Sequence, residues 1–133
     1  MDFHAGFFET SVALALAPHT VSDCRLELPP CPGWPEVGYL LRLANTAALA
    51  GRKAMAREMS YAALASGWTS LDPFPGYTSE PALASARSGE VFVEHILERY
   101  HVAIEEALVD GVPGPKPPMA WVRTLTLGGR LHP

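Results

Sequence analysis

Two proline- and glycine-rich segments divide this 133-residue chain into three stretches that favour helix. The first segment, SDCRLELPPCPGWP, spans residues 22–35, and the second, GWTSLDPFPGYTSE, spans residues 67–80. Proline lacks a backbone N–H and has a fixed φ, so the first segment, which is packed with proline, excludes regular structure, and the second segment is expected to break the helix before it. The length suits a single domain. We therefore expect a helix-rich chain with little sheet.

Two of the three helical stretches precede the second proline- and glycine-rich segment. Residues 10–17 predict a short helix that ends before Pro18, although their alternating apolar pattern also fits a strand. Residues 36–66 are strongly helical and rich in alanine, which permits close helix packing. Gly51 lies in the middle of that stretch and is expected to kink or split the helix.

The third helical stretch covers residues 81–109. Ser79 is its expected N-cap, Pro81 falls in the first turn, and Gly111 stands just past the end, where a C-capping glycine belongs. Beyond a proline-rich linker, residues 121–127 alternate weakly between apolar and polar types and predict one edge strand. Phe3 is a second candidate strand position.

Composition excludes several classes of function. Apolar residues make up 48% of the chain and charged residues 18%, with a net charge of −4. The chain lacks the clustered Lys and Arg of a nucleic-acid or anionic-membrane surface. The charged fraction is below the usual ~25% of soluble domains, which indicates surface hidden in an interface. We therefore expect no nucleic-acid partner, no membrane partner, and self-association or a protein partner.

The cysteines and the N-terminus predict a cytoplasmic protein. Cys24 and Cys31 are separated by six residues (C-x6-C), which is not a zinc-knuckle spacing. A reduced pair with a structural or incidental role is therefore expected. The N-terminus lacks the basic and apolar regions of a secretory signal. No apolar run approaches the ~20 residues that span a bilayer.

One segment carries recognisable chemistry, the opening DFHAGFFETS of residues 2–11. Gly6 lets the backbone turn sharply or approach a ligand closely. His4 can donate or accept a proton near neutral pH. Glu9 falls in the first turn of the predicted helix, where it could orient the histidine or a water. This set is half of a hydrolytic site, since no activated nucleophile and no third metal ligand lies near it.

Simpler interpretations stand beside this one. His4 could be a polar residue on a frayed terminus. Glu9 could be only a helix-start charge, and Asp2 is more readily a turn or cap residue than a ligand. His95 and His101 are six residues apart on a helix and do not share a face well, so metal binding by them is not expected. The three tryptophans and the Met55/Met59 pair are expected to be packing residues.

The opening motif resembles the creatininase (creatinine amidohydrolase) family. The pattern is D-x-H-A-G-x-x-E-T-S, followed by an apolar helix and Pro18. A second stretch, PGYTSEPALASARSGE at 75–90, is similar to the family's final helix in its prolines, its A-S-A and Gly89. Between the two, the alanine-rich stretch 36–66 resembles an insertion relative to the family.

The resemblance implies a fold and a domain division. The family has an α/β/α sandwich and commonly forms oligomers. This chain would be the C-terminal part of that α/β fold and would itself supply mostly helices. Residues 1–112 would be the creatininase-like portion, and residues 113–133 a proline-rich linker and tail.

The resemblance also implies a catalytic role for two residues. The family histidine of HAG transfers protons near two metal ions, and the glutamate of ExT stands beside it; these roles carry over to His4 and Glu9. A divalent metal, zinc or manganese, is implied as well. The family ligands, in an E-x-H, a following Asp and an N-G-H, are absent from this sequence, so the isolated chain is expected to bind no metal tightly.

Two functions follow as alternatives. The first is a creatininase-like metal-dependent amidohydrolase that cleaves a C–N bond in a cyclic or formyl amide, incomplete in this chain. Its substrate would be a small-molecule amide, and the chain would form a homo-oligomer or bind a partner that supplies the N-terminal half. The second is a non-catalytic helical subunit, or a truncated remnant, that acts through association.

Overall fold

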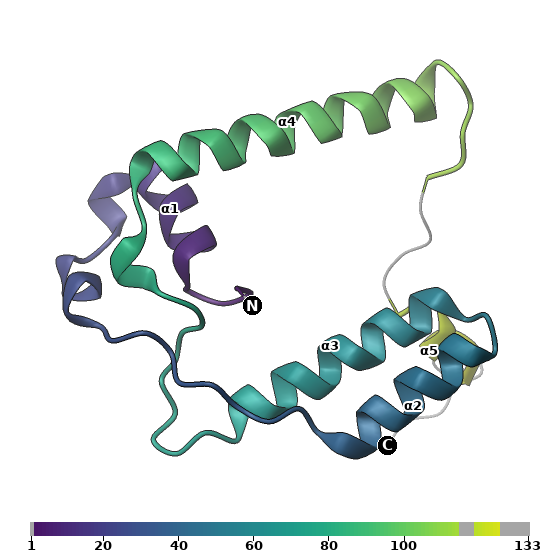
Figure 1. Cartoon of the computed structure of the whole chain (residues 1–133). Helices are drawn as coiled ribbons and strands as arrows, with labels where there is room; N and C mark the ends of the chain where they lie inside the picture. Colours follow the sequence, from purple (N-terminus) through teal and green to yellow (C-terminus); the bar gives the residue numbers. More distant parts are fainter. Residues whose placement is uncertain (1, 115–118, 126–133) are drawn as a thin grey trace. The chain divides into compact units, whose positions relative to one another are not determined.

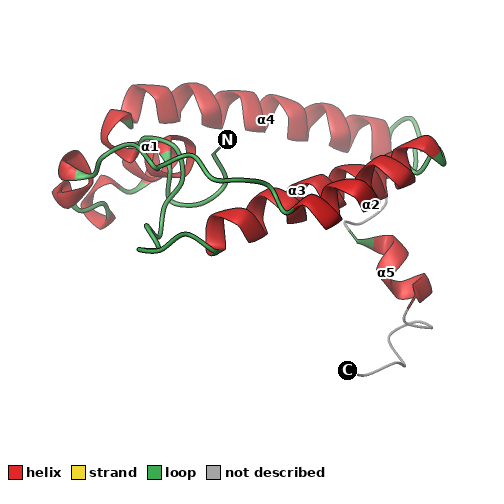
Figure 2. Cartoon of the chain, turned by 60° about the horizontal axis from the view of Figure 1, so that its bottom comes forward, coloured by secondary structure: helices red, strands yellow, loops and turns green. Residues whose placement is uncertain are grey.

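The structure, a computed structural model, describes residues 2–114 and 119–125. These residues form helices joined by loops, without a strand (Figure 2). The α-helices are α1 (Phe7–Leu16), α2 (Gly38–Leu49), α3 (Lys53–Thr69), α4 (Ala86–Leu108) and α5 (Ala120–Leu125), and the short 3-10 helices are η1 (Pro18–Thr20), η2 (Asp23–Glu27) and η3 (Pro81–Leu83). The expected helical character is confirmed, and the strand expected at Phe3 is wrong over this described segment.

The chain divides into two compact units. The first is formed by Met1–Gly33 and Pro75–Gly114, and it contains α1, α4 and the three 3-10 helices. The second takes Trp34–Phe74 together with the C-terminal residues, and it contains α2, α3 and α5.

In the first unit, α1 packs on the N-terminal half of α4 (Figure 1). The helices meet at Gly89, where an added Cβ would lie 1.9 Å from the backbone oxygen of Ser11. Ser11 is completely buried, and its hydroxyl accepts the backbone N–H of Ser85 at 3.2 Å. The ring of Phe92 stacks edge-on against Phe7 and tilts against Phe8. Small residues therefore set a short distance between these helices.

The start of α4 differs from the expected one. Pro81 begins the separate 3-10 helix η3, and α4 starts only at Ala86. Its N-cap is Ser85, whose hydroxyl accepts the N–H of Ser88 at 3.1 Å, so the assignment of Ser79 as N-cap is wrong. Gly111 has a φ of 65°, the left-handed conformation expected of a glycine after a helix.

In the second unit, the alanine-rich stretch folds as a helical hairpin. Gly51, with a φ of 73°, separates α2 from α3, so the expected split at this glycine is confirmed (Figure 1). The buried residues along the two helices are mostly small: Ala44, Ala47, Ala63 and Gly67, with Trp68 beside them. An added Cβ at Gly67 would lie 2.0 Å from the backbone oxygen of Pro35, so the preceding proline-rich loop packs directly on α3.

The C-terminal helix α5 occupies part of the segment expected to be a strand. Residues 121–125 are helical, so the strand prediction is wrong there, and residues 126–127 lie outside the described residues. The carboxylate of Glu58 in α3 accepts the backbone N–H of Met119 at 2.8 Å and also the indole N–H of Trp121. These contacts fix the start of α5 on the second unit.

The first proline-rich segment also contains some regular structure. The 3-10 helix η2 occupies Asp23–Glu27, ahead of the prolines, and the side chain of Ser22 accepts the N–H of Cys24. The expectation of no regular structure across 22–35 is therefore wrong for its first residues. Among the helices of residues 2–114 and 119–125, none combines the length and apolar character that crossing a bilayer requires.

Candidate functional site

The opening segment is held in place by Thr78, which is completely buried. The Thr78 hydroxyl accepts the backbone N–H groups of Phe3 at 3.1 Å and His4 at 3.2 Å. The same hydroxyl donates to the His4 carbonyl at 3.1 Å, and the Thr78 N–H donates to that carbonyl at 2.9 Å. One donor and two acceptor positions of the hydroxyl are thus all used. The backbone of His4 is fixed although its side chain is exposed.

Asp2 and Gly6 shape the turn that follows His4. A carboxylate oxygen of Asp2 accepts the N–H of Phe8 at 2.6 Å, which supplies a partner to one of the open N–H groups at the start of α1. An added Cβ at Gly6 would lie 2.4 Å from the backbone oxygen of Thr78, so only glycine fits this approach. The interpretation of Asp2 as a cap residue is confirmed.

Glu9 reaches back across the same turn. Its Oε2 accepts the backbone N–H of Ala5 at 2.6 Å, and Ala5 has a φ of 45°. The Thr10 hydroxyl donates to the Ala5 carbonyl at 3.3 Å. A non-glycine residue with positive φ costs free energy, and these contacts to both polar groups of Ala5 offset that cost. Glu9 therefore stabilises the helix start with one oxygen and keeps the other available.

A hollow of about 430 Å³ lies beside this turn in the first unit; we call it the α1–η2 hollow. Its polar lining includes Glu9 and Thr10 from α1, and Cys24 and Arg25 from η2. Of the described residues in the opening turn, Ala5 lines the α1–η2 hollow and His4 does not. The structure thus brings Glu9 to a concave surface and places the backbone of His4 one residue from its edge.

Arg25 is the cationic residue of this lining. It is half-buried, and its Nη1 donates to the backbone oxygens of Ala84 at 3.2 Å and Pro81 at 3.5 Å. These two carbonyls fix the guanidinium relative to η3. Its Nε is buried and has no hydrogen-bond partner in the part of the chain that the structure describes.

Comparison with protein families places the geometry in context. The model described as "Creatininase: Creatinine amidohydrolase" matches residues 1–104. The chain belongs to the creatininase family. Searches of curated proteins and of solved structures each returned no match.

The two motif segments that resemble the creatininase family are neighbours in the structure. Residues 2–11 form the opening turn and the start of α1, and residues 75–90 lead into α4. Ser11 contacts Ser85 and Gly89 directly, and Thr78 binds His4. Much of the creatininase pattern in this chain therefore reflects how the opening segment, α1 and α4 pack together.

Creatininase-family proteins are generally metal-dependent, and the described residues do not fit a metal ion. No group of three or more His, Cys, Asp and Glu in them could hold one. Asp2 and Glu9 each already accept a backbone N–H with one carboxylate oxygen. His95 and His101 lie on the exposed part of α4, where His101 approaches Glu105 at 3.5 Å.

Sequence reasoning missed two residues of this region. Thr78 carries no local signal, since its partners are 74 and 75 positions away. Arg25 carries a weak one, because it stands alone as a cation between Cys24 and Leu26 in a proline-rich segment. Cys24 is an exposed free thiol, and Cys31 is half-buried.

Proposed function

We propose that this chain supplies the proton-transfer side of a creatininase-type amidohydrolase that cleaves a C–N bond in a cyclic or formyl amide. The family membership supports an amidohydrolase-type activity in general. The observation that carries the assignment to this segment is the set of hydrogen bonds between Thr78 and the His4 backbone, which we call the Thr78 clamp, because a histidine acts at a defined position only when its backbone is fixed.

In this proposal, His4 acts first as the general base and then as the general acid. As the water oxygen bonds to the amide carbonyl carbon, the His4 imidazole takes a proton from the water; when the C–N bond breaks, the imidazolium gives that proton to the leaving nitrogen, which yields a carboxylic acid and an amine. The second carboxylate oxygen of Glu9 accepts a hydrogen bond from the water or the imidazole and orients it. The contact of the first oxygen with Ala5 supports this role, since it restricts the motion of the carboxylate.

A divalent metal, zinc or manganese, belongs to the proposal through the family alone. The described residues offer no ligand group for it, and no step above passes through it. Its ligands would come from a polypeptide segment other than the described residues.

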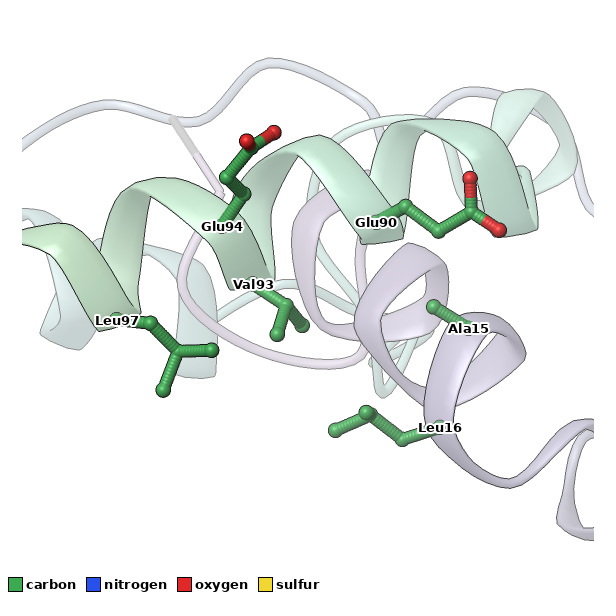
Figure 3. A pocket seen from close by; sticks show the side chains of 6 residues that line it. All are labelled: Ala15, Leu16, Glu90, Val93, Glu94 and Leu97. Atoms are coloured by element: carbon green, nitrogen blue, oxygen red, sulfur yellow. The ribbon is translucent and has the colours of Figure 1, made fainter.

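The proposal includes the rest of the family's α/β/α sandwich and a protein that supplies it. Residues 1–112 would be the creatininase portion and 113–133 the tail. A shallow apolar groove of about 330 Å³ is present where the end of α1 meets α4 (Figure 3). Leu16 and Leu97 line it and are 67% and 63% exposed. From residue 94 to the end of α4 every side chain is exposed, so these apolar groups are available for a second copy or an N-terminal half.

The test is hydrolysis of a cyclic amide and of an N-formyl amide by the full chain in the presence of zinc or manganese. The chain is assayed alone and with a polypeptide that carries the family's E-x-H and N-G-H segments. His4→Ala should lower turnover by ~10²–10⁴-fold, the usual contribution of a general acid. His19→Ala, on the exposed η1, is the matched control and should leave turnover unchanged. Equal turnover in His4→Ala and the wild type would contradict the proposal.

A second candidate function is the non-catalytic helical subunit. The uncovered apolar residues of α4 favour it, because they suit association without chemistry. No hydrolysis under any of the conditions above, together with stable complex formation in light scattering, would support this alternative.

A further inference from the structure

We propose that the α1–η2 hollow binds a carboxylate through Arg25, and that its ligands are N-acyl amino acids or other small amides that carry a carboxylate. The binding proposal stands by itself. Its consequence for substrate choice rests on the proposed amidohydrolase function.

The first support is the fixed position of the Arg25 guanidinium. The carbonyls of Pro81 and Ala84 both accept hydrogen bonds from Nη1. A guanidinium held at one nitrogen loses little further freedom when it binds a ligand, which favours affinity. This anchoring leaves the edge formed by Nε and Nη2 for another partner.

The second support is the unmet hydrogen-bonding capacity of that edge. Arg25 Nε is buried, and no acceptor for it is found within the described residues. A buried donor without a partner costs free energy, and a carboxylate that displaces the side chains covering Nε would supply an acceptor and remove this cost. A carboxylate is the best match, because its two oxygens can accept two parallel N–H groups from one edge of a guanidinium.

The third support is the charge arrangement of the lining. Glu9 and Arg25, both in the described part of the chain, line one hollow without forming an ion pair with each other. The free oxygen of Glu9 can accept the N–H of an amide, while Arg25 takes a carboxylate. The hollow, at about 430 Å³, lies within the usual ~300–1,000 Å³ of small-molecule sites. An N-acyl amino acid presents both groups within one small molecule.

The experiment is an NMR titration of the isotope-labelled full chain with N-acetylglycine and with the neutral N-acetylglycinamide. N-acetylglycine should give saturable shifts of the Arg25 Nε–H signal and of backbone amides around the hollow. N-acetylglycinamide, which lacks the charge, should bind about tenfold or more weakly. Equal binding of the two compounds, or no saturable shift with N-acetylglycine, would overturn the proposal. This comparison uses only the wild-type chain, so it does not depend on a variant that folds.

Variants then assign the effect to Arg25. Arg25→Lys keeps the charge and loses the planar edge, so affinity for N-acetylglycine should fall about tenfold or more. Arg87→Gln, on the exposed first turn of α4, removes a cation elsewhere in the same unit and should leave affinity unchanged. Equal losses in Arg25→Lys and Arg87→Gln would show general charge attraction and overturn the site.

The titration needs no turnover, so its outcome is separate from that of the proposed function. Binding of N-acetylglycine without hydrolysis of any amide would support the carboxylate site and contradict the proposed amidohydrolase function. Hydrolysis of neutral amides without carboxylate binding would support the amidohydrolase function and contradict the carboxylate site.

Discussion

Gly89 in α4 lies so close to the carbonyl of Ser11 in α1 that a Cβ would fall 1.9 Å from the oxygen. There is no room for a side chain between the two backbones at this point. The residue at position 89 therefore determines how closely α1 and α4 approach each other. Because Ser11 also accepts the N–H of Ser85, a displacement of α1 would break that hydrogen bond too.

Gly89→Ala should therefore destabilise the first unit by about 1–3 kcal/mol, the usual cost of forcing an extra carbon into a packed contact. Gly38→Ala is the control, since Gly38 begins α2 and an added Cβ there has no atom within 4 Å. Thermal melting followed by circular dichroism measures both. A melting temperature of Gly89→Ala equal to or above that of the wild type would show that the helices can separate without cost.

Thr78→Val should release the opening segment while preserving the shape of the side chain. It leaves the N–H groups of Phe3 and His4 without the hydroxyl acceptor, at a cost of about 1–3 kcal/mol. Hydrogen exchange of these two amides should accelerate. Thr78→Ser retains the hydroxyl and should restore most of the protection; if it exchanges as fast as Thr78→Val, the clamp depends on packing instead.

Two substitutions at Glu9 separate its structural contact from its proposed chemistry. Glu9→Gln retains a carbonyl oxygen that can accept the Ala5 N–H, so the melting temperature should stay near that of the wild type. Glu9→Ala removes the acceptor and should cost about 0.5–2 kcal/mol, as loss of a helix-start partner does. Turnover of the assembled enzyme should fall in both variants. Full turnover in Glu9→Gln would leave Glu9 with the helix-start role alone.

Glu58→Ala should release α5 from α3, because one carboxylate accepts both the Met119 N–H and the Trp121 indole N–H. Amide exchange of residues 120–122 should accelerate about tenfold or more, since hydrogen bonds to a charged acceptor are among the stronger ones. Glu36→Ala, in the loop before α2, removes an exposed charge and should not change that exchange. Unchanged exchange in Glu58→Ala would mean that other contacts hold the helix.

The helices were predictable because their signals are local. Alanine content, Gly51 and Gly111 indicated where helices run, divide and end, and the structure agrees. The start of α4 was not, because Ser79 followed by Pro81 has the features of a helix start, whereas here Pro81 begins the separate three-residue η3, whose N-cap is Glu80. The segment from residue 121 was misassigned because a short alternating pattern fits strand and helix alike, and the contact of Trp121 with Glu58 is long-range.

The candidate site was predictable only at positions where the residue type and its local motif were enough to indicate a role. His4, Gly6 and Glu9 were recognisable in the opening motif, and the need for glycine at position 6 is visible in its approach to Thr78. The partners of that motif were not recognisable, since a buried threonine and a lone arginine have no spacing rule that links them to residues far along the chain. The roles of His4 and Glu9 in catalysis remain predictions.

The Thr78 clamp also has a consequence for the order in which the chain becomes structured on the ribosome. The opening segment is synthesised before Thr78, Ser85 and Gly89, which hold it and α1 and which follow the whole α2–α3 hairpin in the sequence. Bringing the ends of the long segment between α1 and Thr78 together costs conformational entropy, and only the contacts made by Thr78, Ser85 and Gly89 offset this cost. The nascent chain must therefore carry α1 without its partner helix until α4 has been synthesised, and a chaperone that binds short apolar helices would find its target in α1 during that interval.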